Sequence, residues 1–500
     1  MLAFLPANLA AWSGGVWSAP PERAVLGFGI DSRRIAPGDC FVALATARRD
    51  GHDFVGEAFA RGAAAALVAR PVEGAGAQLV VDSPERALQA IARAHREAFA
   101  GPVVGITGSA GKTSTKDLLH RLLGLDETLA TEGNLNNTLG VPLTLLRLDP
   151  AVHRQAVIEA GINQAGEMDV LADCIRPDHA IVTSVGLAHA EGLGGREGIA
   201  REKARLPAAV PAGGLVLFPE DCLVYPPFRD LRARVLASAP GTGPHDGRLI
   251  FQTTGRAAST ETRLGESAAD PLSDRQRDNR QRQDREISQL KDGMGRPGGL
   301  LTIFGPARPP FSLSLPPMSE GMLRNTVHAL ALARELGVPD AVLAARLAGW
   351  RPSRQRGELF RAGPRVYYVD CYNANPDSMI DALRFFAANF ATRPKRYVLG
   401  SMRELGELFA AGHRSVGQCL RLAPEDAAHF IGDGATAMRE GALAAGNAPE
   451  RLTVAPDAAA VRPALEHFAG AVFLKGSRAY ALERLIPESA EPTTLEALAC

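Results

Sequence analysis

A glycine-rich loop between an apolar strand and a helix carries the clearest chemical signal in this chain. The apolar residues 103–106 (VVGI) precede it, and the loop and first helical turn consist of Thr107, Gly108, Ser109, Ala110, Gly111, Lys112, Thr113 and Ser114. Loop amides, the positive end of a helix dipole and the Lys112 ammonium would face one point, which makes an anion site. The Thr113 hydroxyl would reach a magnesium ion held by bound phosphates. The motif is T-G-x-x-G-K-T, because Ile106 replaces the first glycine of the stricter G-x-x-x-x-G-K-[ST] pattern. A plain turn is the alternative, but the strand before the loop and the Lys-Thr pair after it favour a nucleotide phosphate site.

Further polar residues follow two strand-like runs, 156–162 (AVIEAGI) and 180–186 (AIVTSVG). Ligands collect at the carboxyl ends of parallel strands. Glu159 interrupts the first run and, with Thr113, would supply hard oxygen ligands to magnesium. His189 follows the second run and can be an acceptor for a second metal ion. The alternatives without a metal are that Glu159 pairs with a cation and that His189 donates a hydrogen bond to a backbone carbonyl. An asparagine-rich loop, 131–140 (TEGNLNNTLG), adds Asn134, Asn136 and Asn137.

The elements that must position these residues suggest an α/β protein. At 500 residues the chain suggests about three domains. Apolar strands alternate with helices from residue 103 to about 315, which predicts a parallel sheet with helices on both faces. We divide the chain into 1–96, a mixed α/β domain, 97–350, the central domain with the phosphate-binding loop (P-loop), and 351–500. For residues 351–500, the alternation of strands and helices predicts a smaller, Rossmann-like doubly wound sheet that lacks the G-x-G-x-x-G fingerprint.

Residues 252–299 differ from the rest of the central domain. They are polar, nearly free of aromatic residues and rich in Arg, Gln and Asp. Such a segment cannot bury enough apolar area to offset the cost of ordering, so we predict a disordered insertion. Its arginines suggest RNA, but interleaved acids and missing stacking aromatics favour a solvated linker.

Composition limits the classes of partner. A formal net charge of zero argues against nucleic acid and anionic membranes as partners. No run reaches the roughly 18 apolar residues of a membrane span. The N-terminus has no basic region typical of a signal peptide, and the six scattered cysteines predict reduced thiols, so a cytoplasmic location is expected.

Taken in order, the motifs resemble the Mur ligase superfamily. Besides T-G-x-x-G-K-T, they are EGNLNNTLGVPLTLL (132–146), A-H-x-E-G-x-G (188–194), YNANPDSM (372–379), L-G-x-M-x-E-L-G-E (399–407) and KGSR (475–478). The first and third of these resemble the branch that adds D-alanyl-D-alanine to UDP-N-acetylmuramoyl-tripeptide. The resemblance covers nearly the whole chain outside 252–299. It also gives a ligand role to Asp31, Ser32 and Arg33, which on their own suggest a solvated turn, because IDSR and DGHDF (50–54) resemble a UDP-sugar-binding domain.

The resemblance implies an ATP-dependent amide ligase that works through an acyl phosphate. Lys112 and the loop would hold ATP, with Thr113 and Glu159 on a first Mg²⁺ and His189 serving a second. Lys203 would carry a carbamate, which needs a neutral amine, and we expect Arg201 and Arg205 to lower its pKa. By sequence alone, an ordinary surface lysine is the favoured interpretation of Lys203.

The remaining implied contacts come from the last two domains. Asn325 would contact adenine, Arg356 the γ-phosphate and Asp370 the ribose. Tyr372, Asn373 and Asn375 would line the nucleotide or dipeptide side of a closing domain. Lys475, Ser477 and Arg478 would meet the dipeptide or phosphate. A monomer is expected, with UDP-N-acetylmuramoyl-tripeptide and D-alanyl-D-alanine as partners.

Three positions depart from the family pattern: Val369 replaces an acid, Ser401 an aspartate and Ser184 an asparagine. None is a metal or phosphate ligand, so we expect altered neighbouring contacts only. Two rival interpretations stay open, namely a folylpolyglutamate- or cyanophycin-type ligase of the same build and a nucleotide-binding regulator without turnover.

Overall fold

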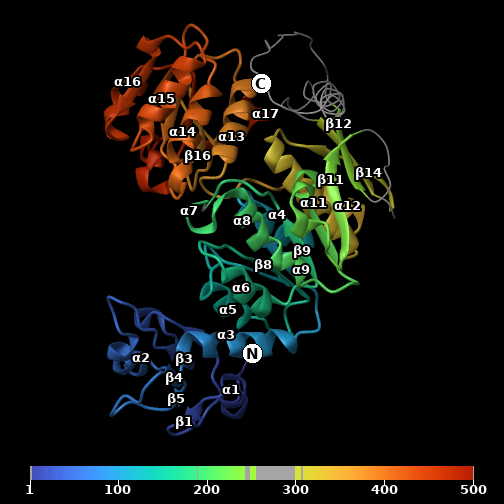
Figure 1. Ribbon diagram of the computed structural model, residues 1–500, viewed down its shortest axis with the longest axis vertical. Helices are drawn as coiled ribbons and strands as arrows, with labels where there is room; N and C mark the ends of the chain where they lie inside the picture. The colour runs from blue at the N-terminus through green and yellow to red at the C-terminus, as the bar shows by residue number, and fades with distance from the viewer. Residues whose placement is uncertain (1–2, 189, 242–247, 255–298, 306–307, 499–500) are drawn as a thin grey trace.

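The computed structural model describes residues 3–188, 190–241, 248–254, 299–305 and 308–498. Within these residues the strands form three sheets, and the chain forms three lobes arranged end to end (Figure 1). The N-terminal lobe lies at one end, the central lobe in the middle and the C-terminal lobe at the other end. The predicted α/β class with three sheet-based units is confirmed. None of the described helices is both long and apolar enough to cross a membrane.

The N-terminal lobe is built on a sheet of order β1-β5-β4-β3-β2, in which only the β1–β5 pair is antiparallel. Strand β4 is buried along its whole length, as a central parallel strand should be. The alanine-rich helix α2 ends at Ala60, and the alanines that follow it, from Ala65, belong to β4. The elements are α1 (Pro6–Ser13), β1 (Val16–Trp17), β2 (Gly27–Gly29), β3 (Asp39–Val42), α2 (Val55–Ala60), β4 (Ala65–Val68), β5 (Gln78–Val80) and α3 (Pro84–Glu97).

Helix α3 joins this lobe to the central one. Its apolar residues Leu88 and Ile91 belong to one buried cluster with Leu9 of α1 and with Val141 and Leu145 of the central lobe. The division predicted at residue 96 therefore falls inside a helix whose apolar side packs on both lobes. The two lobes share a core rather than a linker.

The central sheet has the order β14-β13-β12-β11-β10-β9-β6-β8-β7 and is parallel from β12 to β7. Val103 of β6 packs on one face, with helices α3, α5 and α6, while Val104 and Ile106 pack on the other, with α4, α11 and α12. The elements are β6 (Val103–Thr107), α4 (Lys112–Leu123), β7 (Thr128–Ala130), α5 (Gly140–Leu145), β8 (Gln155–Glu159), α6 (Glu167–Ile175), β9 (His179–Val182), α7 (Ala190–Leu193), α8 (Gly195–Lys203), α9 (Arg205–Ala208), β10 (Leu215–Pro219), β11 (Arg234–Pro240), β12 (Arg248–Thr254), β13 (Gly299–Gly305), β14 (Arg308–Leu315), α11 (Glu320–Glu335) and α12 (Asp340–Ala348).

The edges of the predicted insertion need correction. Gln252–Thr254 continue β12, and Gly299 begins β13, which pairs antiparallel with β12. Both ends of the polar segment are therefore fixed in the sheet. Residues 255–298 lie outside the described residues.

The C-terminal lobe has the sheet order β19-β18-β17-β20-β16-β15-β21, parallel from β19 to β16 and antiparallel at β15 and β21. The predicted Rossmann-like sheet thus carries an antiparallel edge. The elements are β15 (Glu358–Ala362), β16 (Arg365–Asp370), α13 (Pro376–Asn389), β17 (Lys395–Gly400), α14 (Phe409–Gln418), β18 (Ala427–Ile431), α15 (Ala435–Ala444), β19 (Leu452–Ala455), α16 (Arg462–Glu466), β20 (Ala471–Lys475), β21 (Glu491–Thr493) and α17 (Leu495–Leu498).

Candidate active site

A cleft of about 820 Å³ opens between the central and C-terminal lobes, around the P-loop. Loop, central-sheet and C-terminal-lobe residues all line it, although they are far apart in sequence. The predicted residues that line this cleft are Ser109, Ala110, Gly111, Lys112, Thr113, Ser114, Asn134, Asn136, Asn137, Glu159, Asn325, Arg356, Asp370, Tyr372, Asn373, Asn375 and Lys475. The fold therefore brings most of the predicted site together.

Two loop positions accept only glycine. Gly108 has φ +147°, and a Cβ there would lie 1.8 Å from Thr183 Oγ1. Gly111 has φ +81°, and a Cβ there would lie 2.1 Å from Asn325 Nδ2. Both φ values fall in the region that side chains disfavour, and both positions are closed by a neighbour. The loop backbone can thus approach a ligand closely, and Asn325 lies directly against it.

The side-chain hydroxyls of Thr107 and Ser109 bond within the central lobe and hold the loop in place. Thr107 is buried, and its hydroxyl donates to Ala160 O at 2.9 Å. Ser109 Oγ accepts from Gly186 N at 2.8 Å and donates to Gly186 O at 3.1 Å. The Thr107 hydroxyl is therefore bonded to the residue that follows β8, and Thr107 does not line the cleft, so its predicted contact with nucleotide stays a prediction. Ser184, one of the atypical positions, also anchors the loop, since its hydroxyl accepts from Ala110 N at 3.2 Å.

Lys112 and Glu159 bring opposite charges to the floor of the cleft. Lys112 Nζ donates to Gly108 O at 2.7 Å. Burial lowers the Lys112 pKa, while the negative charge of Glu159 acts in the opposite direction. Glu159 is the last residue of β8 and is 2 % exposed. Its Oε1 accepts from Asn136 Nδ2 at 2.7 Å, whereas Oε2 is buried without a hydrogen-bond partner among the described residues.

The three asparagines have different local contacts. Asn136 orients Glu159, as described above. Asn137 Oδ1 accepts from Gly140 N at 2.8 Å, at the N-terminus of α5, and so also acts as a cap for that short helix. Asn134 lines the cleft. The substrate contacts predicted for all three stay predictions.

Lys203 is not the surface lysine that the sequence alone favours. Its side chain is among the largest fully buried ones, 1 % exposed at the end of α8. Its pKa is lowered well below the ordinary value, first by burial and second by the charge of Lys112. The expected role of Arg201 and Arg205 in this shift is wrong, because Arg201 is exposed and Arg205 pairs with Asp169 and Glu202.

Arg356 joins the two walls of the cleft. Its Nη2 donates to Thr113 Oγ1 at 3.0 Å, and its guanidinium lies 4.1 Å from the ring centre of Tyr372. The guanidinium of Arg478 lies 5.3 Å from the same ring. Two guanidinium groups close to the Tyr372 ring place positive charge beside the phosphate loop.

The end of β16 forms a second polar cluster. Asp370 Oδ2 accepts from Lys475 Nζ at 2.5 Å, and Lys475 is 1 % exposed. Asn375 Nδ2 donates to Ser109 O at 3.2 Å, so the C-terminal lobe touches the P-loop backbone directly. Ser477 is buried, and its N–H donates to Ser401 O. The predicted contacts of Asp370, Asn373, Lys475, Ser477 and Arg478 with ligands stay predictions.

Several described residues of the predicted site do not line this cleft, namely Thr107, Gly108, Lys203, Ser477 and Arg478, together with three residues of the N-terminal lobe. Asp31, Ser32 and Arg33 belong to the N-terminal lobe. Arg33 Nε donates to Asp31 Oδ1 at 2.9 Å, and this contact lowers the Asp31 pKa to about 2. Ser32 Oγ donates to Glu57 Oε2 at 2.9 Å. His189 lies outside the described residues.

Sequence reasoning missed several charged residues of the cleft, among them Arg196, Asp377 and Asp381. Asp381 accepts from Gly321 N at 3.2 Å, at the first turn of α11, and burial raises its pKa. Asp377 and Asp381 are four residues apart on α13 and therefore share a helix face. That spacing, directly after a strand and a turn, was the available signal.

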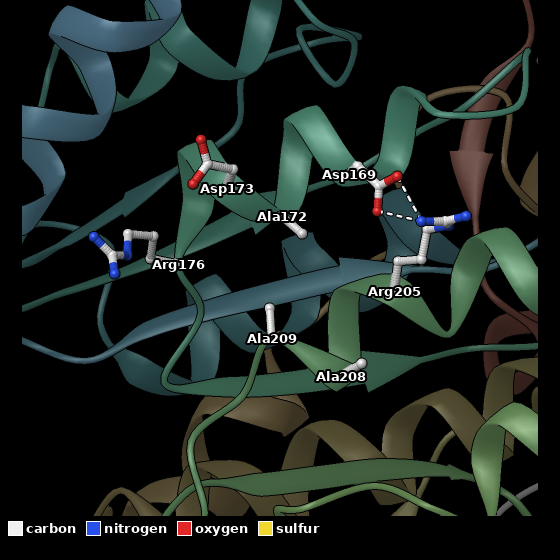
Figure 2. A pocket seen from close by; sticks show the side chains of 7 residues that line it. All are labelled: Asp169, Ala172, Asp173, Arg176, Arg205, Ala208 and Ala209. Carbon is white, nitrogen blue, oxygen red and sulfur yellow. Dashed lines mark hydrogen bonds and ion pairs between the residues drawn. The ribbon is translucent and has the colours of Figure 1, made fainter.

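A second hollow, of about 550 Å³, lies between α6 and α9 (Figure 2). Its walls are alanines and ion-paired charges, and Figure 2 shows Arg205 turned onto Asp169. None of the predicted catalytic, metal-binding or ligand-binding residues is among those that line it. The cleft around the P-loop is therefore the candidate active site.

Comparison with known proteins assigns the three lobes. The description "Mur ligase family, catalytic domain" matches residues 25–97, "Mur ligase middle domain" matches 106–246 and "Mur ligase, glutamate ligase domain" matches 355–478. The UDP-N-acetylmuramoyl-tripeptide--D-alanyl-D-alanine ligase of Bacillus subtilis is 30 % identical over 444 residues, which is 87 % of each chain. The ligase of the same name from Mycobacterium tuberculosis is 33 % identical over 425 residues, or 78 % of this chain and 74 % of that one.

Solved structures show the same three-lobe build. A crystal structure of MurF from Acinetobacter baumannii superposes with a TM-score of 0.79 at 27 % identity, covering 97 % of this chain and 98 % of that chain. MurF from Thermotoga maritima, solved in complex with ADP, has a TM-score of 0.71 at 24 % identity, over 92 % and 96 % of the two chains.

Proposed function

The chain belongs to the Mur ligase family, and on that basis we propose that it joins D-alanyl-D-alanine to the terminal carboxylate of UDP-N-acetylmuramoyl-tripeptide with ATP. The products are ADP, phosphate and the UDP-muramoyl-pentapeptide of peptidoglycan synthesis. The observation that carries the proposal is the cleft in which the glycine-rich loop, Lys112 and Glu159 meet Arg356 of the C-terminal lobe.

The chemistry follows from the weakness of a carboxylate as an electrophile. A carboxylate oxygen of the tripeptide attacks the γ-phosphorus of ATP, the bond to ADP breaks, and an acyl phosphate forms. The amine of D-alanyl-D-alanine then attacks the carbonyl carbon, and the tetrahedral intermediate expels phosphate and leaves an amide. Lys112, Arg356 and the loop amides stabilise the negative charge on the phosphoryl group during transfer.

The residues present fit magnesium. Glu159 Oε2 is a buried acceptor without a donor among the described residues, and the Thr113 hydroxyl lies at the start of α4 in the same cleft. Among the described residues, no three His, Cys, Asp and Glu side chains converge on one point, so Mg²⁺ would also rely on water and phosphate oxygens. Bound there, Mg²⁺ would neutralise phosphate charge, and we assign Glu159 and Thr113 to it. Service of a second ion by His189 stays part of the proposal.

Lys203 is the proposed site of a carbamate. A carbamate forms only on a neutral amine, and burial next to Lys112 favours the neutral form. The carbamate carries negative charge and would face the Lys112 ammonium. Carbon-13 NMR of protein prepared with labelled bicarbonate tests this, and a Lys203→Gln variant that keeps the carbamate signal would rule it out.

The two other lobes supply the reactants. We propose that Asp31, Ser32 and Arg33 hold the UDP end of the donor in the N-terminal lobe, and that Tyr372, Arg478 and Lys475 face the dipeptide. We also propose that the protein is a monomer, and the nucleotide substrates support a cytoplasmic location.

Phosphate release measured with all three substrates tests the proposal. We expect release to depend on ATP, on the UDP-linked tripeptide and on D-alanyl-D-alanine together. Folate and other carboxylates offered in place of the UDP-linked tripeptide should give no phosphate release. Release that is independent of the dipeptide, or an absence of release with both diaminopimelate- and lysine-containing tripeptides, would refute it.

A further inference from the structure

Asp377, in the first turn of α13, contacts the central lobe twice. Its Oδ2 accepts from Leu187 N at 3.2 Å, and its Oδ1 accepts from Arg196 Nη2 at 3.0 Å. The ion pair alone is worth little, because the side chains of Arg196 and Asp377 are 44 % and 45 % exposed. The contact with the Leu187 backbone is different, because it fixes where the segment after β9 lies relative to α13.

That segment is in turn bonded to the P-loop. Gly186, next to Leu187, exchanges two hydrogen bonds with Ser109, and Ser109 N donates to Ser184 O at 2.9 Å. A Cβ built on Gly186 would lie 2.3 Å from Asp377 Oδ2 and 3.4 Å from Ser109 Cβ. The backbone at Gly186 is therefore clamped between the Asp377 carboxylate and the P-loop.

Asn375 contacts the P-loop from the same turn of the same lobe. Its Nδ2 donates to Ser109 O, and its Oδ1 caps α13 by accepting from Ser378 N at 2.9 Å. Asn375 is 5 % exposed, so its hydrogen bond with Ser109 is shielded from solvent. The N-terminus of α13 thus reaches Ser109 directly through Asn375 and indirectly through Asp377 and Gly186.

We propose that Asp377 is a positioning residue that couples docking of the C-terminal lobe to the shape of the P-loop, acting through Gly186 and Ser109. The proposal rests on the proposed ligase function, because it concerns how ATP is held during that reaction. An aspartate in a first helical turn also stabilises its own helix, so the test must separate the two roles.

A double-mutant cycle between Asp377 and Gly186 makes that separation. We expect Asp377→Ala to lower kcat/KM for ATP about tenfold, equivalent to about 1.4 kcal/mol, while the KM for the UDP-linked tripeptide changes less than twofold. Gly186→Ala should cost a similar factor, because its new methyl group meets the carboxylate. In the double variant that carboxylate is gone, so the loss should stay within twofold of Asp377→Ala alone.

Independent effects would instead multiply to about a hundredfold loss, and that result would overturn the proposal. So would a change of less than twofold in Asp377→Ala. Asp377→Asn keeps an acceptor for Leu187 N–H and should retain activity within threefold of the wild type. An Asp377→Asn loss as large as that of Asp377→Ala would also contradict the assignment.

The matched control is Glu440→Ala. Glu440 pairs with Arg414 inside the C-terminal lobe, with side chains 52 % and 47 % exposed, and neither residue touches the cleft. The kcat/KM for ATP of this variant should be unchanged, and the melting temperature of each variant shows that it is folded.

ADP binding, measured by calorimetry, repeats the double-mutant cycle without turnover. If the wild type has no ligase activity but ADP binding shows the same non-additive pattern, the proposed function fails and the coupling stands. Additive losses in ADP binding would overturn the coupling even in an active ligase.

Discussion

The substitution Glu159→Gln should remove the magnesium contact of the cleft while it leaves the nucleotide contacts in place. The substitution keeps the shape of the side chain and an oxygen for Asn136 Nδ2, which lies 2.7 Å from Oε1 in the wild type. It removes the charge from a carboxylate whose Oε2 is buried and unpartnered within the described part of the chain. We therefore expect Glu159→Gln to bind ADP through Lys112 and the loop, but to lose the additional effect of Mg²⁺.

The size of that effect follows from linkage. A ligand present at 100 times its Kd stabilises the folded state by about 2.7 kcal/mol. One kcal/mol shifts the melting temperature of a domain of about 150–250 residues by about 2–4 °C. Magnesium added to the wild type with ADP should therefore raise the melting temperature by about 5–10 °C. Loss of a preorganised electrostatic contact should lower turnover about 10²- to 10³-fold.

Thermal melting with ADP, with and without Mg²⁺, measures the difference. Asp221→Asn is the control, because Asp221 also lines the cleft but is exposed and pairs with Arg324. It should keep the whole magnesium increment. A Glu159→Gln protein that keeps the wild-type increment would refute the assignment of Glu159 to the metal.

Three further predictions concern other contacts of the cleft. Arg356→Lys should lower kcat/KM for ATP about tenfold or more in steady-state assays, because lysine lacks the fork that contacts both Thr113 and Tyr372; unchanged kinetics would contradict it. Asn136→Ala should weaken the apparent affinity for Mg²⁺ about tenfold in titrations of turnover, because Glu159 Oε1 loses its donor, a loss of about 1–3 kcal/mol; an unaltered titration would argue against this. Burial raises the Asp381 pKa above its ordinary 3.8, so the wild type should lose stability relative to Asp381→Asn as the pH rises from 3.8 through the raised pKa. Denaturant unfolding across that range measures the difference, and a gap that is constant with pH would count against the prediction.

Sequence patterns predicted the elements of this site better than the burial of its side chains. The P-loop, the parallel strands around it and the polar residues at their carboxyl ends all follow from local spacing. Lys203 shows the limit, because a lysine that directly follows Arg201 and Glu202 resembles part of a solvated helix face. Its burial is decided by the packing of α8 in the central lobe, which no local pattern encodes.

The second limit of the sequence-based prediction concerns contacts between segments that are far apart in the chain. Thr107 and Ser109 belong to the motif, but their hydroxyls bond Ala160 O and Gly186, partners set by strand order rather than by spacing. Asp377 is visible in the sequence only as an acid in a first helical turn, while its contacts with Leu187 and Arg196 depend on how two lobes dock.

Among the three departures from the family pattern, Ser401 is explained by the structure. Its buried hydroxyl donates to Ile431 O and accepts from Gly434 N, which ties two strand ends.

The central claim is that this cleft activates a carboxylate by moving a phosphoryl group onto it. Oxygen-18 at both oxygens of the terminal carboxylate of the UDP-linked tripeptide follows that step directly, because one carboxylate oxygen becomes the bridging oxygen of the acyl phosphate and leaves with phosphate. Mass spectrometry of the inorganic phosphate should show one labelled oxygen for each amide formed. Unlabelled phosphate accompanying amide formation would contradict the account.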